Sequence, residues 1–372
     1  MSLILLGHPH TERTEYFLKA ASELLTDWEF VEPVKLIPLP SFTSKAGEAA
    51  DSDEDFDFSP LQNCVVKVDP PPPESYPIDC LNTVMERYHR FLLKLQSVKG
   101  IRLWNSGSAI WDTLDKFICK ERLQKKGLPV TPALTDSCGC PVRIGSHDQL
   151  KVIMREKGIG QVFIKPRLGS GGAGVVAYRH NHKTGKETME TCAELSGREP
   201  RFLRTSAVSS GKRLNNTRKL RKTCDAERIR PLINKVLAQE AIVEEWIPKA
   251  SYNGKAFDLR AVYQSGRLEF IVARQSNGAI TNLHLNDSAL AVSDLALSRS
   301  MLSEIESLCC KAAALFPGLN TAGFDLLLQK NTMIIMIIEI NGQGDLIYKD
   351  IFADNRIFKA QIRAMKYLQE KE

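Results

Sequence analysis

The feature that most constrains this chain is an apolar segment that ends on a lysine and leads into a glycine-rich turn. Val162-Phe163-Ile164-Lys165-Pro166 precedes Gly169-Ser170-Gly171-Gly172-Ala173-Gly174, and a second β-branched segment begins at Val175. This pattern predicts a strand, a turn and another strand. Glycines let backbone N–H groups approach phosphate oxygens, and a lysine at the end of a buried strand needs an anion. The segment therefore predicts a phosphate-binding hairpin, although a flexible hairpin without a ligand would share the glycines.

A second apolar segment runs from Ala241 through Glu244-Glu245-Trp246-Ile247 and breaks at Pro248. It is typical of a nucleotide hinge, in which backbone groups contact the adenine edge and a carboxylate holds the ribose. An ordinary edge strand would have the same sequence, because proline is tolerated at the edge of a sheet. Both interpretations stay open on this segment alone.

Residues 257 to 274 contain two β-branched runs joined at Ser265-Gly266, which predicts an antiparallel hairpin. Asp258 and Arg260 lie on one face of the first strand because side chains alternate, and Arg274 lies on the second strand. Two arginines that face a site would stabilise charge on a transferring phosphoryl group. A surface salt bridge between Asp258 and Arg260 is the simpler alternative.

Two further apolar strands carry oxygen-bearing side chains near their ends. Asp325 lies in Gly323-Phe324-Asp325-Leu326-Leu327, and Glu339 and Asn341 follow the apolar run that begins at Met333. Buried carboxylates need a cation, and carboxylate and amide oxygens suit Mg²⁺. The segment predicts a magnesium site, unless the carboxylates simply reach water at the strand ends.

Taken in order, these segments resemble the ATP-grasp superfamily, most closely its ribosomal-protein glutamate ligases and glutathione-synthetase-like enzymes. The resemblance runs from about Asn105 to Leu346, and over its whole length the chain resembles a bacterial group of ATP-grasp proteins. It implies ATP and Mg²⁺ as cofactors, with Mn²⁺ as a substitute. It places Arg274 beside the γ-phosphate, with Arg260 on the neighbouring strand, and makes Asp325, Glu339 and Asn341 the metal ligands. The nucleotide-binding residues that it implies are Lys116, Lys165, Ser170, Gly171, Gly172, Glu245, Trp246, Ile247, Asp258 and Asn282.

The fold class expected from this resemblance is α/β (α+β). Residues 1–110 are expected to form an N-terminal α/β pre-ATP-grasp domain, and residues 111–372 the ATP-grasp domain. Within the latter we expect a central lobe at about 111–240, with a basic insertion at about 180–230, and a C-terminal lobe at about 241–372. A helix is expected to begin at Asp112, just after the boundary.

The activity that the resemblance implies is an ATP-dependent carboxylate–amine ligase, which forms an amide or peptide bond through an acyl phosphate. Two alternatives stay open, namely a nucleotide-binding module without catalysis and a phosphotransferase on the same fold. The chain departs from the glutamate ligases at Ile280, where they have arginine, and at Gly342-Gln343-Gly344, where they have a Ser-Pro-Gly ending. Substrate contacts of those positions are therefore not carried over. Dimers and tetramers among relatives leave a homo-oligomer open.

The charge of the chain is concentrated in one segment. The formal net charge is +6, but residues 201–235 hold eleven basic and two acidic residues, so the rest of the chain is slightly acidic. This segment is either a solvated loop or a docking surface for an acidic peptide or a phosphorylated carrier. It has almost no aromatic residues for base stacking, which argues against nucleic acid.

The remaining composition restricts the location of the protein. Nine cysteines, an odd number with no paired metal-ligand spacing, favour reduced thiols and a cytoplasmic protein. No apolar run approaches the roughly 18 residues that span a bilayer, so no membrane partner is expected.

Overall fold

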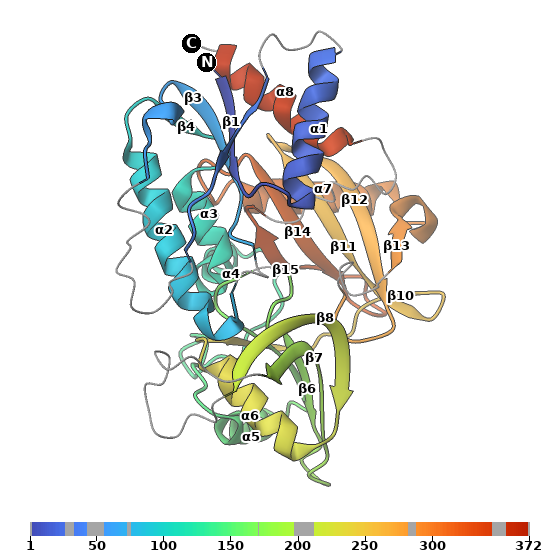
Figure 1. Cartoon of the computed structure of the whole chain (residues 1–372). Helices are drawn as coiled ribbons and strands as arrows, with labels where there is room; N and C mark the ends of the chain where they lie inside the picture. Colours follow the sequence, from blue (N-terminus) through green and yellow to red (C-terminus); the bar gives the residue numbers. More distant parts are fainter. Residues whose placement is uncertain are drawn as a thin grey trace.

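The computed structural model describes residues 2–26, 33–42, 56–72, 76–169, 171–196, 212–281, 288–343 and 355–370. Three sheets form its framework (Figure 1). The first sheet is parallel, with the strand order β2-β1-β3-β4, and two helices connect its strands. Its elements are β1 (Ser2–Gly7), α1 (Glu12–Thr26), β2 (Lys35–Pro38), β3 (Cys64–Val68), α2 (Leu81–Ser97) and β4 (Ile101–Leu103).

The helices α1 and α2 cover opposite faces of this first sheet, because successive side chains of a strand point to opposite sides. Leu3 and Leu5 of β1 share a core with Phe17 of α1, whereas Ile4 and Leu6 share a core with α2. The chain therefore turns in opposite directions after β1 and after β3. Such a reversal leaves a crevice beyond the carboxyl ends of the two strands.

The second sheet has five antiparallel strands in the order β8-β7-β6-β5-β9, and it lies at the bottom of Figure 1 with α5 and α6 against it. As predicted, the glycine-rich segment joins two neighbouring strands, β5 and β6. Its elements are α5 (His147–Glu156), β5 (Gln161–Lys165), β6 (Val176–His180), β7 (Glu187–Ser196), β8 (Arg213–Thr223), α6 (Ala226–Leu237) and β9 (Ile242–Glu245).

Strand β8 corrects the interpretation of the basic segment as a solvated loop. Residues 213–216 and 221–223 pair antiparallel with β7, with an irregularity between them, while residues 197–211 lie outside the described part of the chain. Thr217 and Asn216 of this strand line the cleft described below. Residues 213–223 of the basic segment are therefore a strand of the sheet.

The third sheet is antiparallel, with the order β13-β12-β11-β14-β15 and β10 beside β11. The predicted hairpin is confirmed as β11 and β12, and the predicted neighbouring strands as β14 and β15. The elements are β10 (Ser251–Tyr252), β11 (Lys255–Gln264), β12 (Arg267–Ser276), β13 (Ser288–Ala291), α7 (Arg299–Ala313), β14 (Thr321–Leu328), β15 (Ile335–Asn341) and α8 (Arg356–Glu370).

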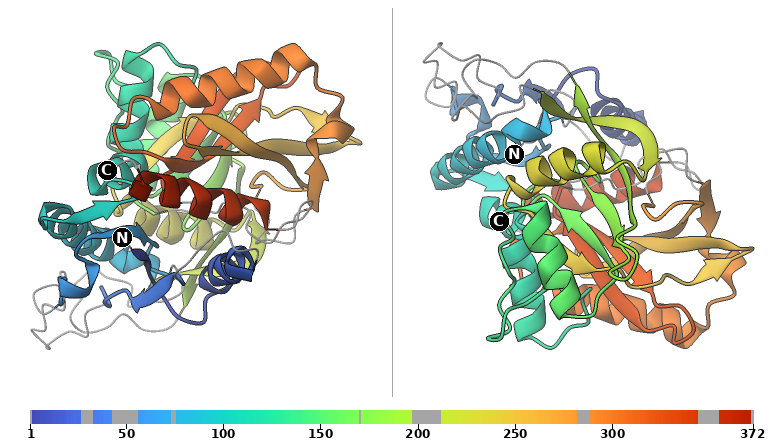
Figure 2. Two further views of the ribbon diagram at one scale, coloured as in Figure 1. Left: turned by 90° about the horizontal axis from the view of Figure 1, so that it is seen from above. Right: turned by 90° about the horizontal axis from the view of Figure 1, so that it is seen from below.

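Strand β11 shows how this third sheet serves both a core and a site. Leu259 and Ala261 lie in the core that contains α7, and Asp258, Arg260 and Val262 lie on the opposite face. On that face Val262 shares a core with α8, which lies beside α1 and across the sheet (Figures 1 and 2). The same face is thus apolar under α8 and charged beyond it.

The helix expected from Asp112 is in fact two helices, α3 (Gly107–Leu114) and α4 (Lys116–Lys125). The side chain of Asp115 separates them because it accepts hydrogen bonds from the first N–H groups of α4. Ser106 caps α3 in the same way. Capping side chains, rather than apolar spacing, set both starts.

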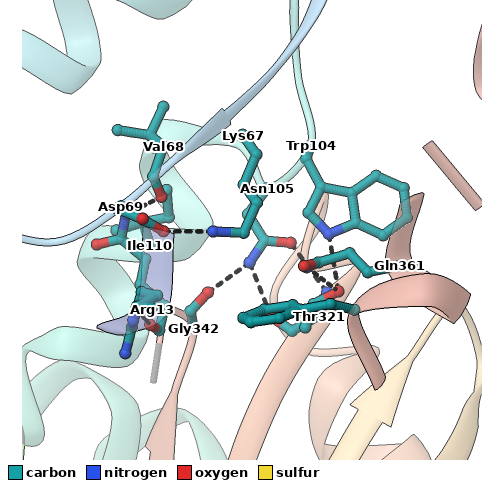
Figure 3. A pocket seen from close by; sticks show the side chains of 12 residues that line it. Arg13, Lys67, Val68, Asp69, Trp104, Asn105, Ile110, Thr321, Gly342 and Gln361 are labelled. Atoms are coloured by element: carbon teal, nitrogen blue, oxygen red, sulfur yellow. Dashed lines mark hydrogen bonds and ion pairs between the residues drawn. The ribbon is translucent and has the colours of Figure 1, made fainter. Parts of the chain in front are cut away.

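Asn105 joins the first sheet to the third. Its Oδ1 accepts hydrogen bonds from the backbone N–H groups of Asn320 (2.8 Å) and Thr321 (2.9 Å). Its Nδ2 donates to the carbonyl of Thr321 (2.7 Å) and to that of Gly342, as Figure 3 shows. One buried side chain therefore fixes the ends of two strands of the third sheet against β4.

We expect Asn105→Ala to lower the free energy of unfolding by about 2–4 kcal/mol, because several buried backbone groups lose their partner. Urea unfolding measures the change. Asn181→Ala is the control, since this exposed asparagine caps only a surface turn and should cost about 1 kcal/mol or less. Equal losses in the two variants would contradict the role of Asn105.

Candidate functional site

A cleft of about 380 Å³ lies where the three sheets meet. The first sheet contributes mainly apolar side chains, the second contributes the glycine-rich segment and β9, and the third contributes charged side chains. Most of the predicted site residues line it: Lys165, Gly171, Gly172, Glu245, Ile247, Asp258, Arg260, Arg274, Asp325, Glu339 and Asn341.

A row of alternating charges crosses the third sheet at the bottom of this cleft. Asp258 of β11 pairs in register with Arg274 of β12, and the Arg274 Nε lies 2.8 Å from the Asp258 Oδ1. Arg260 of β11 pairs with Asp325 of β14, with 2.7 Å between Nε and Oδ1. Asp325 in turn lies opposite Glu339 of β15. The register of four strands therefore brings residues from distant parts of the chain into one row, which we call the charged row.

The alternative of a surface salt bridge between Asp258 and Arg260 is wrong, because both side chains are buried, at 2% and 5% exposure, in ion pairs with residues of neighbouring strands. Burial by itself raises the pKa of Asp258, but Arg274 and Lys249 outweigh it and hold this pKa well below its usual range. Burial raises the pKa of Asp325, although Arg260 opposes the shift.

The side chains of Asp325, Glu339 and Asn341, the predicted metal site, are compatible with Mg²⁺. Asp325 Oδ1 is a buried oxygen to which no hydrogen bond is directed within the described ranges, despite two guanidinium groups at ion-pair distance. In those ranges no three His, Cys, Asp or Glu side chains gather as metal ligands. Mg²⁺ needs fewer, because one or two carboxylates suffice when phosphate and water oxygens complete the shell. The residues present therefore suit Mg²⁺ bound together with a phosphate-bearing ligand.

Glu244 is the centre of a second buried charge cluster, at the junction of β9 and β5. Its two oxygens lie 2.8 Å from Lys120 Nζ and 2.7 Å from Lys165 Nζ, and Thr131 donates a further hydrogen bond of 2.8 Å. Burial opposes ionisation of Glu244, but the two lysines prevail and lower its pKa to about 2. This cluster fixes Lys165 at the cleft wall.

Lys116 lies behind the glycine-rich segment rather than in the cleft. Its Nζ donates to the carbonyl of Gly169 (2.7 Å) and lies 3.5 Å from Glu339. Gly169 has a φ of +93°, and a Cβ there would lie 3.1 Å from Leu81 of α2. The segment is therefore packed between α2 and Lys116, which argues against a hairpin without structural ties.

The backbone of β9 forms hydrogen bonds on both of its edges, to β5 on one and to residues 132–134 on the other. The N–H of Trp246 donates to the carbonyl of Gln161 in β5 (3.3 Å). Along an antiparallel ladder, hydrogen-bonded and non-hydrogen-bonded residue pairs alternate. The backbone groups of Glu245, the residue before Trp246, therefore point away from β5. The N–H of Glu245 donates to Pro132 (2.9 Å), and its carbonyl faces the same outer side. The adenine hinge at Glu245, Trp246 and Ile247 stays a prediction, and of the outward groups of Glu245 the carbonyl is the one that a ligand could contact.

The side chain of Trp246 is not among those that line the cleft. The indole of Trp246 packs on Phe163 and under the guanidinium of Arg179, 4.2 Å from the ring centre. Ser170 and Asn282 lie outside the described residues.

Two lysines of the site were missed by sequence reasoning. Lys120 follows Lys116 by one helical turn of α4, and this spacing of four was a usable signal. Lys249 lies 2.8 Å from Asp258 and also donates to Thr281; it comes directly after Pro248, where no pattern marks it. Cleft-lining residues of the first sheet, such as Arg13, had no sequence signal either, because their approach to the cleft depends on how the sheets meet.

Solved structures share this fold at low sequence identity. D-cycloserine synthetase DcsG matches with a TM-score of 0.57 and 12% identity over 99% of this chain and 100% of that chain. The ATP-grasp ligase PsnB, complexed with a phosphomimetic variant of minimal precursor, Mg and ADP, matches with 0.55 and 15% over 100% and 99%. The macrocyclase MdnC from Microcystis aeruginosa, bound with precursor peptide MdnA, matches with 0.51 and 14% over 98% and 100%.

A scan against known protein families and a search of curated proteins both find no match. At these identities the structural likeness concerns the fold, and the expected ATP-grasp fold is confirmed. Among the described helices, none is long and apolar enough to cross a membrane. The nine cysteines are free thiols in the structure.

We expect Glu244→Gln to destabilise the protein by about 3 kcal/mol at pH 7, because two buried lysines lose their shared carboxylate. The folded pKa of Glu244, about 2, lies below its ordinary value of 4.5. Its contribution is therefore complete above about pH 4.5 and is lost as pH falls toward 2. Urea unfolding between pH 7 and pH 3 should show that the difference in free energy of unfolding between the wild type and Glu244→Gln becomes smaller as pH falls.

The control for this prediction is Glu121→Gln, which removes the carboxylate of an exposed pair with Lys125 and should change stability by less than about 1 kcal/mol. A gap between wild type and Glu244→Gln that stays constant with pH would contradict the predicted linkage.

Proposed function

We propose that this protein is an ATP-dependent ligase that joins a carboxylate to an amine through an acyl phosphate. The observation that supports it most strongly is the charged row in the same cleft as Lys165 and the glycine-rich segment. A site of this composition holds a polyphosphate, a divalent cation and developing negative charge together. The order of the sequence motifs also supports the proposal, because it resembles that of ribosomal-protein glutamate ligases and glutathione-synthetase-like enzymes.

The nucleotide would lie between the second and third sheets. The outward carbonyl of Glu245 and the backbone of Ile247 would contact the adenine, and Lys165 and the glycine-rich segment would contact the phosphates. Lys116 would support that segment from behind. When bound by Asp325, Glu339 and Asn341, Mg²⁺ would neutralise phosphate oxygens of ATP.

The guanidinium groups of Arg260 and Arg274 would stabilise the charge that develops when a substrate carboxylate attacks the γ-phosphorus. The bond from this phosphorus to the bridging oxygen breaks and releases ADP, which leaves an acyl phosphate. An amine then attacks the acyl carbon and phosphate departs. Since Asp258 and Asp325 already hold both guanidinium groups in place, little reorganisation is needed at the moment of transfer.

The direct test is ADP release measured with panels of carboxylates and amines, singly and in pairs. We expect release above background only when a carboxylate and an amine are both present. ADP release that needs an alcohol would instead indicate a phosphotransferase. ATP binding without turnover on any pair would indicate a nucleotide-binding module.

We expect Glu339→Gln to reduce kcat by roughly a hundredfold and to raise the Mg²⁺ concentration for half-maximal rate, because the cation loses a charged ligand. Asp148→Asn is the control, since this carboxylate pairs with Arg230 on the surface of the second sheet's helices. Its kinetics should equal those of the wild type. A Glu339→Gln enzyme with wild-type dependence on Mg²⁺ would contradict the metal assignment.

We further propose that β8 guides an acidic peptide or a phosphorylated carrier to the cleft. Lys219, Arg221 and Lys222 are exposed on this strand, close in sequence to Asn216 and Thr217, which line the cleft. A positive strand at the rim attracts negative substrates and increases their rate of association. Arg221 also lies 2.9 Å from Glu194, a partly exposed pair that holds it only weakly.

Replacing Lys219, Arg221 and Lys222 by glutamine should raise KM for an acidic peptide substrate by roughly tenfold at low salt, with the KM for ATP unchanged. Lys183→Gln with Lys186→Gln is the control, because these lysines are exposed at the β6–β7 turn. The same KM in all three proteins would remove β8 from substrate binding. Extending the substitutions to Lys212, Arg213 and Arg218 tests the whole basic segment.

A further inference from the structure

The crevice beyond the carboxyl ends of β1 and β3 contains polar groups that the proposed transfer chemistry does not use. Lys67 and Asp69, at the end of β3, line a small cavity of about 20 Å³ there, and Arg13 of α1 lies at its border (Figure 3). Arg13 and Gln343 line both this cavity and the large cleft. The two spaces therefore adjoin at the point where open α/β sheets bind their ligands.

Asp69 has a carboxylate oxygen without a donor. It is 3% exposed, and its Oδ1 forms a buried ion pair with Lys67. Its Oδ2 receives no hydrogen bond within the part of the chain that the structure describes. A Cβ at Gly7 would lie 3.0 Å from this Oδ2, so the end of β1 leaves it room. A buried acceptor of this kind suits an N–H or O–H donor of a ligand.

Arg13 presents a cation to the cleft. Its guanidinium donates to the backbone carbonyl of Gln343, and among the described residues no carboxylate forms an ion pair with it. The planar guanidinium matches a carboxylate in two parallel hydrogen bonds. It is thus a cation that α1 offers to an anionic group in the cleft.

The other residues that the first sheet and α2 contribute to the cleft are largely apolar, and Tyr88 adds a hydroxyl that accepts a hydrogen bond from Gln343. A substrate there would bury hydrocarbon rather than charge, because an unpaired charge on this side of the cleft would lose its hydration. The apolar lining residues are Pro70, Pro71, Tyr76, Ile78, Leu81 and Met85.

We propose that this side of the cleft binds an α-amino acid with an apolar side chain as one of the two substrates, an inference that rests on the proposed ligase function. Arg13 holds its carboxylate, the Asp69 Oδ2 accepts a hydrogen bond from its amino group, and its side chain lies along Tyr76, Leu81 and Met85. Arg13 is then a specificity-determining residue of the proposed reaction.

Isothermal titration calorimetry of the full chain with ADP and Mg²⁺ tests this assignment without turnover. L-leucine, L-methionine and L-phenylalanine should bind, and L-glutamate and L-lysine should bind at least tenfold more weakly. The analogues 4-methylpentanoate, which lacks the amino group, and 3-methylbutylamine, which lacks the carboxylate, should each lose roughly tenfold or more relative to leucine.

Arg13→Gln should weaken leucine binding by roughly tenfold or more and leave 3-methylbutylamine unaffected, because this analogue has no carboxylate. Arg102→Gln is the matched control: Arg102 also donates from Nη1 to a backbone carbonyl, that of Leu368 at 2.7 Å, and lines neither space. Its leucine affinity should equal that of the wild type.

The inference is overturned if no apolar amino acid binds the wild type, if glutamate or lysine binds best, or if Arg13→Gln keeps wild-type affinity for leucine. These outcomes differ from failure of the proposed function. Leucine binding without ADP release on any carboxylate and amine pair would refute the ligase and leave the subsite standing. ADP release with other substrates would do the reverse.

Discussion

The charged row across β12, β11, β14 and β15 is the interaction on which the site depends. Burying Asp258, Arg260, Arg274 and Asp325 in one sheet face is tolerable because each charge meets an opposite charge in register on the next strand. Their positions are therefore fixed by the strand pairing itself. A site that must stabilise transferring charge gains from such fixed groups, because they need not reorient during the reaction.

The surrounding elements cover one end of this row with an apolar core and leave its other end in the cleft. Under α8 the same sheet face is apolar, with Val262 and Val272 packed against the helix, so water is excluded from one end of the row. Toward the second sheet the face borders the cleft. On that side the ion pairs of Glu244 with Lys120 and Lys165 connect β9 to α4 and to β5. Asn105 fixes the first sheet against the third through its hydrogen bonds to Thr321.

Local sequence predicted much of this because the relevant signals are local. The lysine-ended strand with its glycine turn, the hairpin of β11 and β12, and the strand with Glu339 follow from alternation and turn chemistry within a few residues. The failures came from long-range effects. The alternative of a pair between Asp258 and Arg260, two positions apart on one strand, is wrong because Asp258 pairs with Arg274, sixteen positions away on the next strand. The basic segment was open to interpretation as a loop because its ladder partner, β7, lies beyond residues 197–211.

The sequence by itself determined which side chains are available for phosphate and metal chemistry, and on which face of a strand each one lies, because a strand has a period of two. Tertiary structure decided which of them meet. Register across four strands selects the ion pairs of the charged row, and the packing of α2 against the glycine-rich segment places Lys116 behind Gly169 rather than in the cleft. The reversal of connections between β1 and β3, a property of topology, brings Arg13 and Asp69 to the crevice beside the cleft. No spacing in the chain encodes that meeting, because it depends on how separate sheets pack.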